Sequence, residues 1–438
     1  MASSRLTFTA EPIHRRGARR ALALAIAAGL CGAWSVAAAT TPQAGALPAR
    51  AEPQAIEAAL AALRGADLVV VDDPVPGRAP AALLATRAAV SPAALAATLG
   101  DPRAYRDAIP SLVRADVVGR RRAARGDIDD QLIEWELEIP LFNLHGKAWV
   151  SRRADGVDLV LAEGDLAPGK LAFTWMPAPA SRPGAGTILV LESQVNMRSA
   201  GWIFRRVASR SPFGESAMNV TAAYVVLRAA VERALHPTDT AARRPRGSRS
   251  PPAPSALRTD AAALASSPTL DPFRPRGAVA AVRRTPDGHL ASVAVAVPVA
   301  LDPDALAASL VVPGNWLAFP GWHRAKPLAG DRIAIDDNLP LVDFDAVWQL
   351  ARDRLRGFTA IAVDGATHGA LFAWDVAPAP ARGAARGSIA VLGFYPRLET
   401  AGYVPRKFIA AEPLLEHGMS LALSYADAMS MARALVTR

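Results

Sequence analysis

The sequence predicts an α+β protein built from two tandem copies of one unit, each a run of antiparallel strands closed by a long helix. An internal repeat carries this prediction: at a shift of 211 residues, segment 92–102 lies over 303–313 with seven of eleven positions identical. Further along, the shift settles at 201 and pairs Gly186 with Gly387 and Tyr224 with Tyr425. Collinear matches over roughly 150 residues indicate two related domains rather than a short-period solenoid.

Composition and the repeat divide the chain into five segments. The linker is predicted to be extended, because its many prolines and polar residues bury little apolar surface. The segments are a signal peptide (1–39), an N-terminal tether with a short helix (40–65), a first domain (66–236), a Pro/Arg/Ser-rich linker (237–276) and a second domain (277–438).

The N-terminal segment has the pattern of a secretory signal peptide. Arginines at 15, 16, 19 and 20 precede an apolar run from Ala21 to Ala39, which ends in small residues suited to cleavage. We therefore expect a periplasmic or secreted protein, with a retained N-terminal membrane anchor as the alternative. Arginine far outnumbers lysine and alanine is abundant, which is typical of bacterial genomes rich in G and C.

Charge and cysteine content exclude several classes of function. The formal net charge is +9, but the leader carries +4 and segment 236–290 carries +5. The rest of the chain, which includes most of the two folded units, therefore has no net charge. A nucleic-acid binder gathers basic residues on a folded face, so we expect no nucleic-acid partner. Cys31 is the only cysteine, so the mature chain has no disulfide or thiol nucleophile. The seven histidines lack ligand spacing, and we expect neither a metal nor a cofactor.

Both copies begin with the same order of elements. Two strands are expected first, over 67–71 and 82–90 in the first copy and 279–283 and 292–301 in the second. Ser91-Pro92 and Asp302-Pro303 then predict a helix start, because an N-cap residue precedes proline at the first helical position. A second short helix is expected next, containing Tyr105 in the first copy and Trp316 in the second.

Residues 132–139 predict a half-buried antiparallel strand. Apolar side chains alternate there with Glu134, Glu136 and Glu138, which we place on the solvated face. Further strands are expected over 142–152, 157–162, 171–176 and 187–197. Each copy closes with a long helix, over 215–235 and 413–436, and apolar residues recur on one side of it at helical spacing.

This order resembles the START-like (SRPBCC) superfamily, the helix-grip fold of lipid-transfer domains and bacterial polyketide cyclase/dehydrase-like proteins. The late-strand patterns 169–175 and 369–374 and the turns 201–205 and 402–406 before the long helices agree with it. The second copy departs from the first by a net loss of 12 residues in its middle strands. The resemblance implies a curved antiparallel sheet around the long helix, enclosing an apolar cavity.

The apolar faces of the predicted elements supply the lining of such a cavity. In the first domain these residues are Ile133, Trp135, Leu137, Ile139, Phe173, Trp175, Val220, Tyr224 and Leu227, and in the second they are Phe372, Trp374 and Tyr425. An arginine stands at the same position in both copies, Arg205 in the first and Arg406 in the second. We expect both at the cavity mouth, where they could bind an anionic head group. The alternative is that the apolar residues simply fill a core and the arginines form surface ion pairs.

Three functions remain open at this point. The first is an exported binding protein for a hydrophobic small molecule or lipid, which is compatible with membrane contact but does not require it. The second is a cyclase- or dehydratase-type enzyme of the same fold, for which Glu192 is the first candidate acid or base. The third is a non-catalytic interaction protein with filled cavities. We name no catalytic residue beyond that candidate and leave the enzyme question open, leaning against activity.

Overall fold

The structure is a computed structural model. It describes residues 52–109, 111–122, 130–139, 142–179, 186–210, 212–239, 245, 251–312, 315, 323–339, 342–352, 356–380 and 387–436. The predicted leader, most of the tether and Trp316 lie outside these residues.

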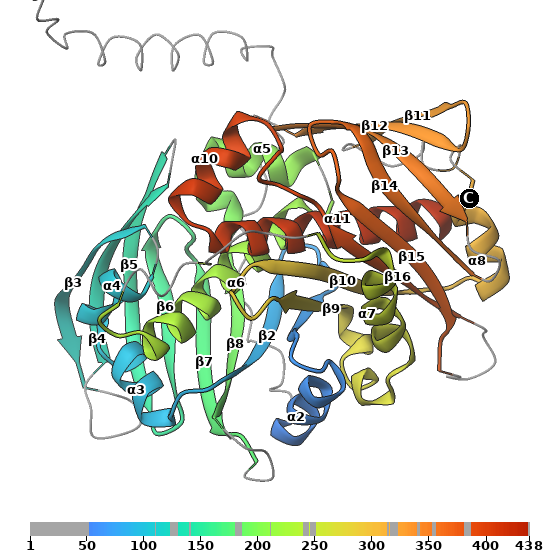
Figure 1. Ribbon diagram of the computed structural model, residues 1–438. Helices are drawn as coiled ribbons and strands as arrows, with labels where there is room; N and C mark the ends of the chain where they lie inside the picture. Colours follow the sequence, from blue (N-terminus) through green and yellow to red (C-terminus); the bar gives the residue numbers. More distant parts are fainter. Residues whose placement is uncertain are drawn as a thin grey trace, which may run out of the picture. The chain divides into compact units, whose positions relative to one another are not determined.

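The elements confirm the predicted order, with a long helix at the end of each half (Figure 1). The first half contains α2 (Pro53–Ala62), β1 (Asp67–Asp72), β2 (Ala81–Ala88), α3 (Pro92–Gly100), α4 (Tyr105–Ala108), β3 (Leu112–Arg121), β4 (Asp130–Ile139), β5 (Phe142–Arg153), β6 (Gly156–Gly164), β7 (Gly169–Pro177), β8 (Thr187–Val195), α5 (Trp202–Arg210) and α6 (Gly214–Leu235). The second half contains α7 (Pro254–Ser266), β9 (Gly277–Arg284), β10 (Leu290–Val299), α8 (Pro303–Leu310), β11 (His323–Leu328), β12 (Arg332–Leu339), β13 (Val342–Arg352), β14 (Gly357–Gly365), β15 (Leu371–Pro378), β16 (Ser388–Tyr395), α10 (Tyr403–Ala411) and α11 (Leu414–Val436).

The strands of the described residues join in one 16-stranded antiparallel sheet. Its order is β11-β12-β13-β14-β15-β16-β10-β9-β1-β2-β8-β7-β6-β5-β4-β3, so both halves have the same strand order, running outward from the centre. The halves meet where β1 pairs with β9. There Val69 lies opposite Ala280 and Val70 opposite Val279, a register that a two-fold rotation would reproduce. The duplicated units therefore share a sheet edge instead of exposing it.

The sheet is covered on both faces at its centre. We call the face that carries α6 and α11 the inner face, and the face that carries α2 and α7 the outer face. Alternation along β1 divides the two cores: Val69 and Val71 pack with α6 and α11, whereas Leu68 and Val70 pack under α2 and α7. The buried stripe on α6 runs from Val220 to Val231, as its spacing predicts.

The two long helices pack directly against one another. The Thr221 hydroxyl of α6 donates a hydrogen bond of 3.0 Å to the Gly418 carbonyl of α11. A Cβ at Gly418 would lie 2.9 Å from the Thr221 carbonyl oxygen, so this crossing requires a residue without a side chain. Phe213 and Tyr425 pack edge to face across the same junction, with ring centroids 6.2 Å apart.

The extended linker is a wrong prediction for residues 254–276. Residues Pro254–Ser266 form α7, which buries Leu257, Ala261 and Leu264 against the outer face. This helix occupies the position of α2 in the repeat, with Pro254 corresponding to Pro53 at a shift of 201. The high proline content of this segment led to the prediction of an extended linker, although its apolar residues recur at helical spacing. Proline does not prevent the helix, because Pro254 stands at the helix start, where proline is tolerated.

The expected helix starts are confirmed. The Ser91 side chain accepts a hydrogen bond of 3.2 Å from the Ala94 amide, and Asp302 caps α8 in the same way. Tyr105 begins α4 and donates to the Leu99 carbonyl at 2.7 Å.

Two strands lay outside the prediction. β3 and β11 each form the first strand of a hairpin at the outer edge of the sheet. The two halves differ in length mainly in this hairpin. β3 and β4 have ten residues each, whereas β11 and β12 have six and eight. The polar, partly exposed pattern of β3 resembles a surface loop, and only pairing with β4 makes it a strand.

Candidate functional site

The lining predicted for the first half lies together on the inner face. β4 contributes Ile133 and Trp135, β7 contributes Phe173 and Trp175, and α6 contributes its stripe. All of these side chains are buried, at 7% exposure or less: Ile133, Trp135, Phe173, Trp175, Val220, Tyr224 and Leu227. Leu137 is partly buried against the same cluster, and the Ile139 side chain lies outside the described residues.

The corresponding residues of the second half are also buried on the inner face. Phe372 and Trp374 come from β15, and Tyr425 comes from α11. Trp348 on β13, which the sequence argument missed, packs on Phe372 with ring centroids 4.7 Å apart. Phe358 packs edge to face with Phe372, with ring centroids 5.9 Å apart. Alternation with Ala346 and Leu350 is the signal that could have placed Trp348 in this face.

The two arginines expected at a cavity mouth lie on helices rather than turns. Arg205 is on α5 and Arg406 on α10, and both side chains are exposed. Arg406 Nε donates to the Gly402 carbonyl at 2.7 Å, one turn earlier in the chain. The turn predicted before each long helix is therefore a separate short helix in each half.

Glu192 faces away from the long helix. The neighbouring Ser193 donates a hydrogen bond of 2.8 Å to Asn219 Oδ1 on α6, so Ser193 is on the inner face and Glu192 on the outer face. Its cross-strand neighbour Leu83 packs in the core under α2. Glu192 is buried there. The expectation that it could act as an inward acid or base is wrong, because strand parity turns it to the other side.

A buried polar network at the junction of the halves is the main feature that sequence reasoning missed. Asp67 on β1 accepts from the Thr86 hydroxyl at 2.5 Å and from the Tyr224 hydroxyl at 2.7 Å. Arg228 Nη1 donates to Thr86 Oγ1 at 3.0 Å and lies 3.9 Å from Asp67 Oδ1. Arg228 also donates to Glu232 Oε1 at 2.5 Å. Asp67 and Arg228 are 3% and 1% exposed, so the charges are paired inside the core.

The second half contributes Arg284 to this network. Its Nε lies 3.7 Å from Asp67 Oδ2, and its Nη1 donates to Glu232 Oε1 at 3.4 Å. Burial raises the pKa of Tyr224 well above its ordinary value, and the Asp67 charge adds to the effect. Burial lowers the pKa of Arg228, but the charges of Asp67 and Glu232 outweigh it and hold that pKa above the ordinary value. Both side chains therefore keep their protons.

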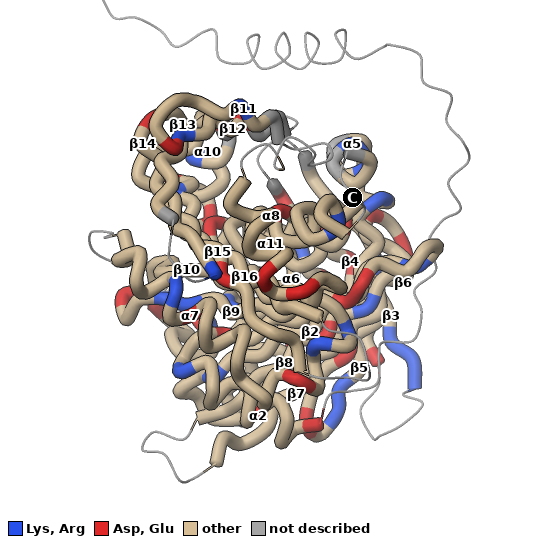
Figure 2. Tube along the Cα trace, turned by 90° about the vertical axis from the view of Figure 1, so that its right-hand side faces the viewer, with Lys and Arg blue, Asp and Glu red and all other residues tan. Residues whose placement is uncertain are grey.

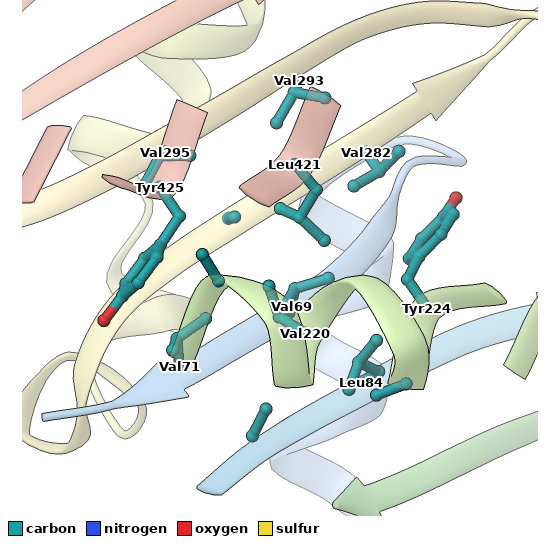
Figure 3. Packing of buried hydrophobic residues seen from close by; sticks show 14 of the residues in the cluster. Val69, Val71, Leu84, Val220, Tyr224, Val282, Val293, Val295, Leu421 and Tyr425 are labelled. Carbon is teal, nitrogen blue, oxygen red and sulfur yellow. The ribbon is translucent and has the colours of Figure 1, made fainter. Parts of the chain in front are cut away.

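The equivalent position in the second half is built differently. Ala278 stands on β9 where Asp67 stands on β1, at the shift of 211, and Met429 stands where Arg228 stands at the shift of 201. Tyr425 corresponds to Tyr224, and burial raises its pKa too. Figure 3 shows Tyr224 and Tyr425 on either side of Val220 and Leu421. Within the described residues, the network that joins Asp67, Arg228 and Arg284 therefore lies at one end of the β1–β9 junction.

The predicted solvated row is confirmed on β4. Glu134 forms an ion pair with Arg114 of β3 at 2.8 Å, and Glu138 is exposed. His145, on the neighbouring strand β5, is also exposed. Residues of both charge signs mark these strands in Figure 2. No helix within the described residues is long and apolar enough to cross a membrane.

Comparison with known proteins gives structural matches only. No protein-family model matches the chain, and no curated protein matches it. It is similar to the di-domain ARO/CYC StfQ from the steffimycin biosynthetic pathway, with 12% identity and a TM-score of 0.27, over 81% of this chain and 97% of that one. For the di-domain ARO/CYC BexL from the BE-7585A biosynthetic pathway the values are 10%, 0.24, 82% and 97%.

A START superfamily protein from Mycobacterium smegmatis matches over 26% of this chain and 75% of its own, with 17% identity and a TM-score of 0.22. We assign the fold from the strand order and helix placement of the chain itself. Each half is an antiparallel sheet with a long C-terminal helix on its inner face, which is the arrangement of a helix-grip fold, and the chain holds two such halves in tandem.

Proposed function

We propose that the protein binds a hydrophobic small molecule or lipid between the inner face of the sheet and the long helix. One observation carries the proposal: strands and helix bring the aromatic and aliphatic side chains of each half together on one buried face. Small-molecule sites are lined mainly by hydrophobic and aromatic side chains, and this buried face supplies such side chains from both the sheet and the helix. Glu192 lies on the outer face of the sheet, so it cannot act on a ligand bound at the inner face. The enzyme alternative therefore loses its first candidate acid or base.

The test begins with the native protein. Mass spectrometry after purification under non-denaturing conditions should detect a bound apolar compound, and a fluorescent fatty-acid probe should bind with submillimolar affinity. Failure to extract any such compound, together with failure of a broad lipid panel to bind, would contradict the proposal and favour the interaction protein with filled cavities.

A matched pair of variants locates the binding. Ala148 is fully buried on the inner face opposite Ile133, at the place where the second half has Trp348 opposite Ile333. Ala148→Trp should weaken probe binding at least tenfold by filling the space. Val160→Trp, at an exposed position on β6, should leave binding unchanged. Ala148→Leu, a smaller increase in volume, keeps the test valid if the tryptophan variant does not fold.

We propose export for the same protein on the basis of the N-terminal arginines and the apolar run that follows them. Intact-mass measurement of the protein from the periplasm and medium of a bacterial host should show loss of about the first 39 residues. Recovery of the uncleaved chain in the membrane fraction would instead support the anchor.

A further inference from the structure

We propose that the first half binds its ligand through a hydrogen bond from Trp135 Nε1, so that the preferred ligand carries a carbonyl or ether oxygen rather than hydrocarbon alone. This inference rests on the proposed function and names the ligand class of that site. It starts from a buried polar atom: Trp135 is 7% exposed, and its indole N–H has no hydrogen-bond partner among the described residues.

The position of the ring places this N–H in the apolar core of the inner face. Trp135 lies opposite Gly146 of β5, and a Cβ at Gly146 would come within 2.9 Å of the indole Cζ2 and 3.1 Å of Cε2. The six-membered ring therefore lies on the β5 backbone, where only glycine leaves room. Cε2 is bonded to Nε1, so the donor is held close to the same strand, in the cluster that includes Phe173 and the α6 stripe.

An indole N–H buried without a partner is unfavourable. Leaving such a donor unsatisfied costs on the order of 1–3 kcal/mol, and buried tryptophans usually find an acceptor. Indole nitrogen is a donor only, so whatever satisfies it must supply an oxygen or another acceptor. A ligand oxygen meets this need in the binding site that we propose.

The donor belongs to one half of the protein. Ile335 stands at the corresponding position of β12, opposite Ala346, and has no polar atom in its side chain. The inner face of the second half thus lacks this donor, although its strand order is the same. The part of the oxygen preference that Trp135 supplies therefore belongs to the first half.

The experiment compares two probes that differ in one oxygen. Prodan carries a propionyl ketone on a dimethylaminonaphthalene, and its 6-propyl analogue has the same skeleton without the carbonyl. The full-length wild-type protein should bind Prodan about tenfold more tightly than the propyl analogue, which is the effect of roughly one buried hydrogen bond. Trp135→Phe, which keeps an aromatic ring and loses the N–H, should bind the two probes equally.

The control is Trp175→Phe, which removes a tryptophan from the same face; it should retain the preference for the ketone. Wild-type protein that binds both probes equally, or a Trp135→Phe variant that keeps the preference, would overturn the hydrogen bond but leave the proposed function intact. Wild-type protein that binds neither probe, and no member of the lipid panel, would overturn the proposed function itself.

A measurement without ligand tests whether the Trp135 indole N–H lacks a partner in the free protein or is already bonded to another group of the protein. If it lacks a partner, Trp135→Phe should lower the midpoint of thermal unfolding less than Trp175→Phe does, because only the first substitution removes an unsatisfied donor. A larger loss in Trp135→Phe than in Trp175→Phe would show that the N–H is already bonded within the protein, and would overturn the inference.

Discussion

Tyr224 of α6 donates a hydrogen bond of 2.7 Å to Asp67 of β1, which ties the long helix of the first half to the strand that joins the two halves. Both side chains are buried. This contact is one of several polar contacts between α6 and the central strands, and because it is buried, water cannot replace it when it is lost.

Tyr224→Phe should lower the free energy of unfolding by about 1–3 kcal/mol, because a hydrogen bond to a buried carboxylate is lost. Urea denaturation followed by circular dichroism measures this change. Tyr425→Phe is the matched control, since Ala278, whose side chain has no acceptor, stands where Asp67 stands, and it should cost less than about 1 kcal/mol. Equal losses in both variants would contradict the role of Asp67.

Alkaline pH should destabilise the fold through its buried tyrosines. Burial raises the pKa of Tyr105, Tyr224 and Tyr425 in the folded chain, whereas the unfolded chain releases these protons near pH 10. The stability is therefore complete below about pH 10 and falls as the pH rises, by about 1.4 kcal/mol per pH unit for each tyrosine. Denaturation between pH 10 and 12 should show a slope that Tyr425→Phe reduces by one such increment. An unchanged slope would mean that Tyr425 ionises in the folded chain.

Arg228→Met should cost about 3–5 kcal/mol, although methionine occupies the equivalent position 429 of the second half. The loss arises because the substitution leaves the Asp67 and Glu232 carboxyl groups without their buried cation. Adding Asp67→Asn should recover part of this loss, since it removes one uncompensated charge, and chemical denaturation of the single and double variants measures the coupling. Met429→Leu, the control, should change stability by less than about 1.5 kcal/mol. Additive losses would show that the charges do not interact.

Gly418→Val should lower stability by about 1–3 kcal/mol, because its side chain would meet the Thr221 backbone at the crossing of α6 and α11. The thermal midpoint of unfolding provides the measurement. Gly387→Val serves as the control, since a Cβ there lies 3.5 Å from its nearest neighbour, an ordinary contact. A variant at 418 as stable as the wild type would mean that the helices can separate freely.

Neither half, expressed as a separate fragment, should be a stable monomer in solution. A fragment of residues 42–239 would expose the β1 edge and the side of α6 that packs on α11. Size-exclusion chromatography with light scattering should show self-association of this fragment, and mixing with residues 251–438 should restore a 1:1 complex. A stable, monomeric fragment would contradict the single continuous sheet.

Local pattern was sufficient for much of the fold. The alternation around Trp135, the caps at Ser91 and Asp302 and the stripe from Val220 to Val231 each reflect forces within one element, so their strands and helices are confirmed. The same patterns placed Phe173 and Tyr224 on buried faces. Helix α7 was missed because composition was weighed above spacing, and β3 because its residues form a strand only when β4 supplies the hydrogen bonds.

The sequence by itself determined the duplication, the order of elements and the apolar faces, since these depend on periodicity and on residue chemistry close along the chain. Only the tertiary structure decided that β1 pairs with β9, that Glu192 faces outward, and that Asp67, Arg228 and Arg284 meet in one network. These relationships join residues up to about two hundred positions apart, and they depend on strand register and helix crossing. A shift of one residue in register reverses every side chain of a strand. Strand β8 is buried along its whole length, so its own sequence does not show which of its side chains face the long helix.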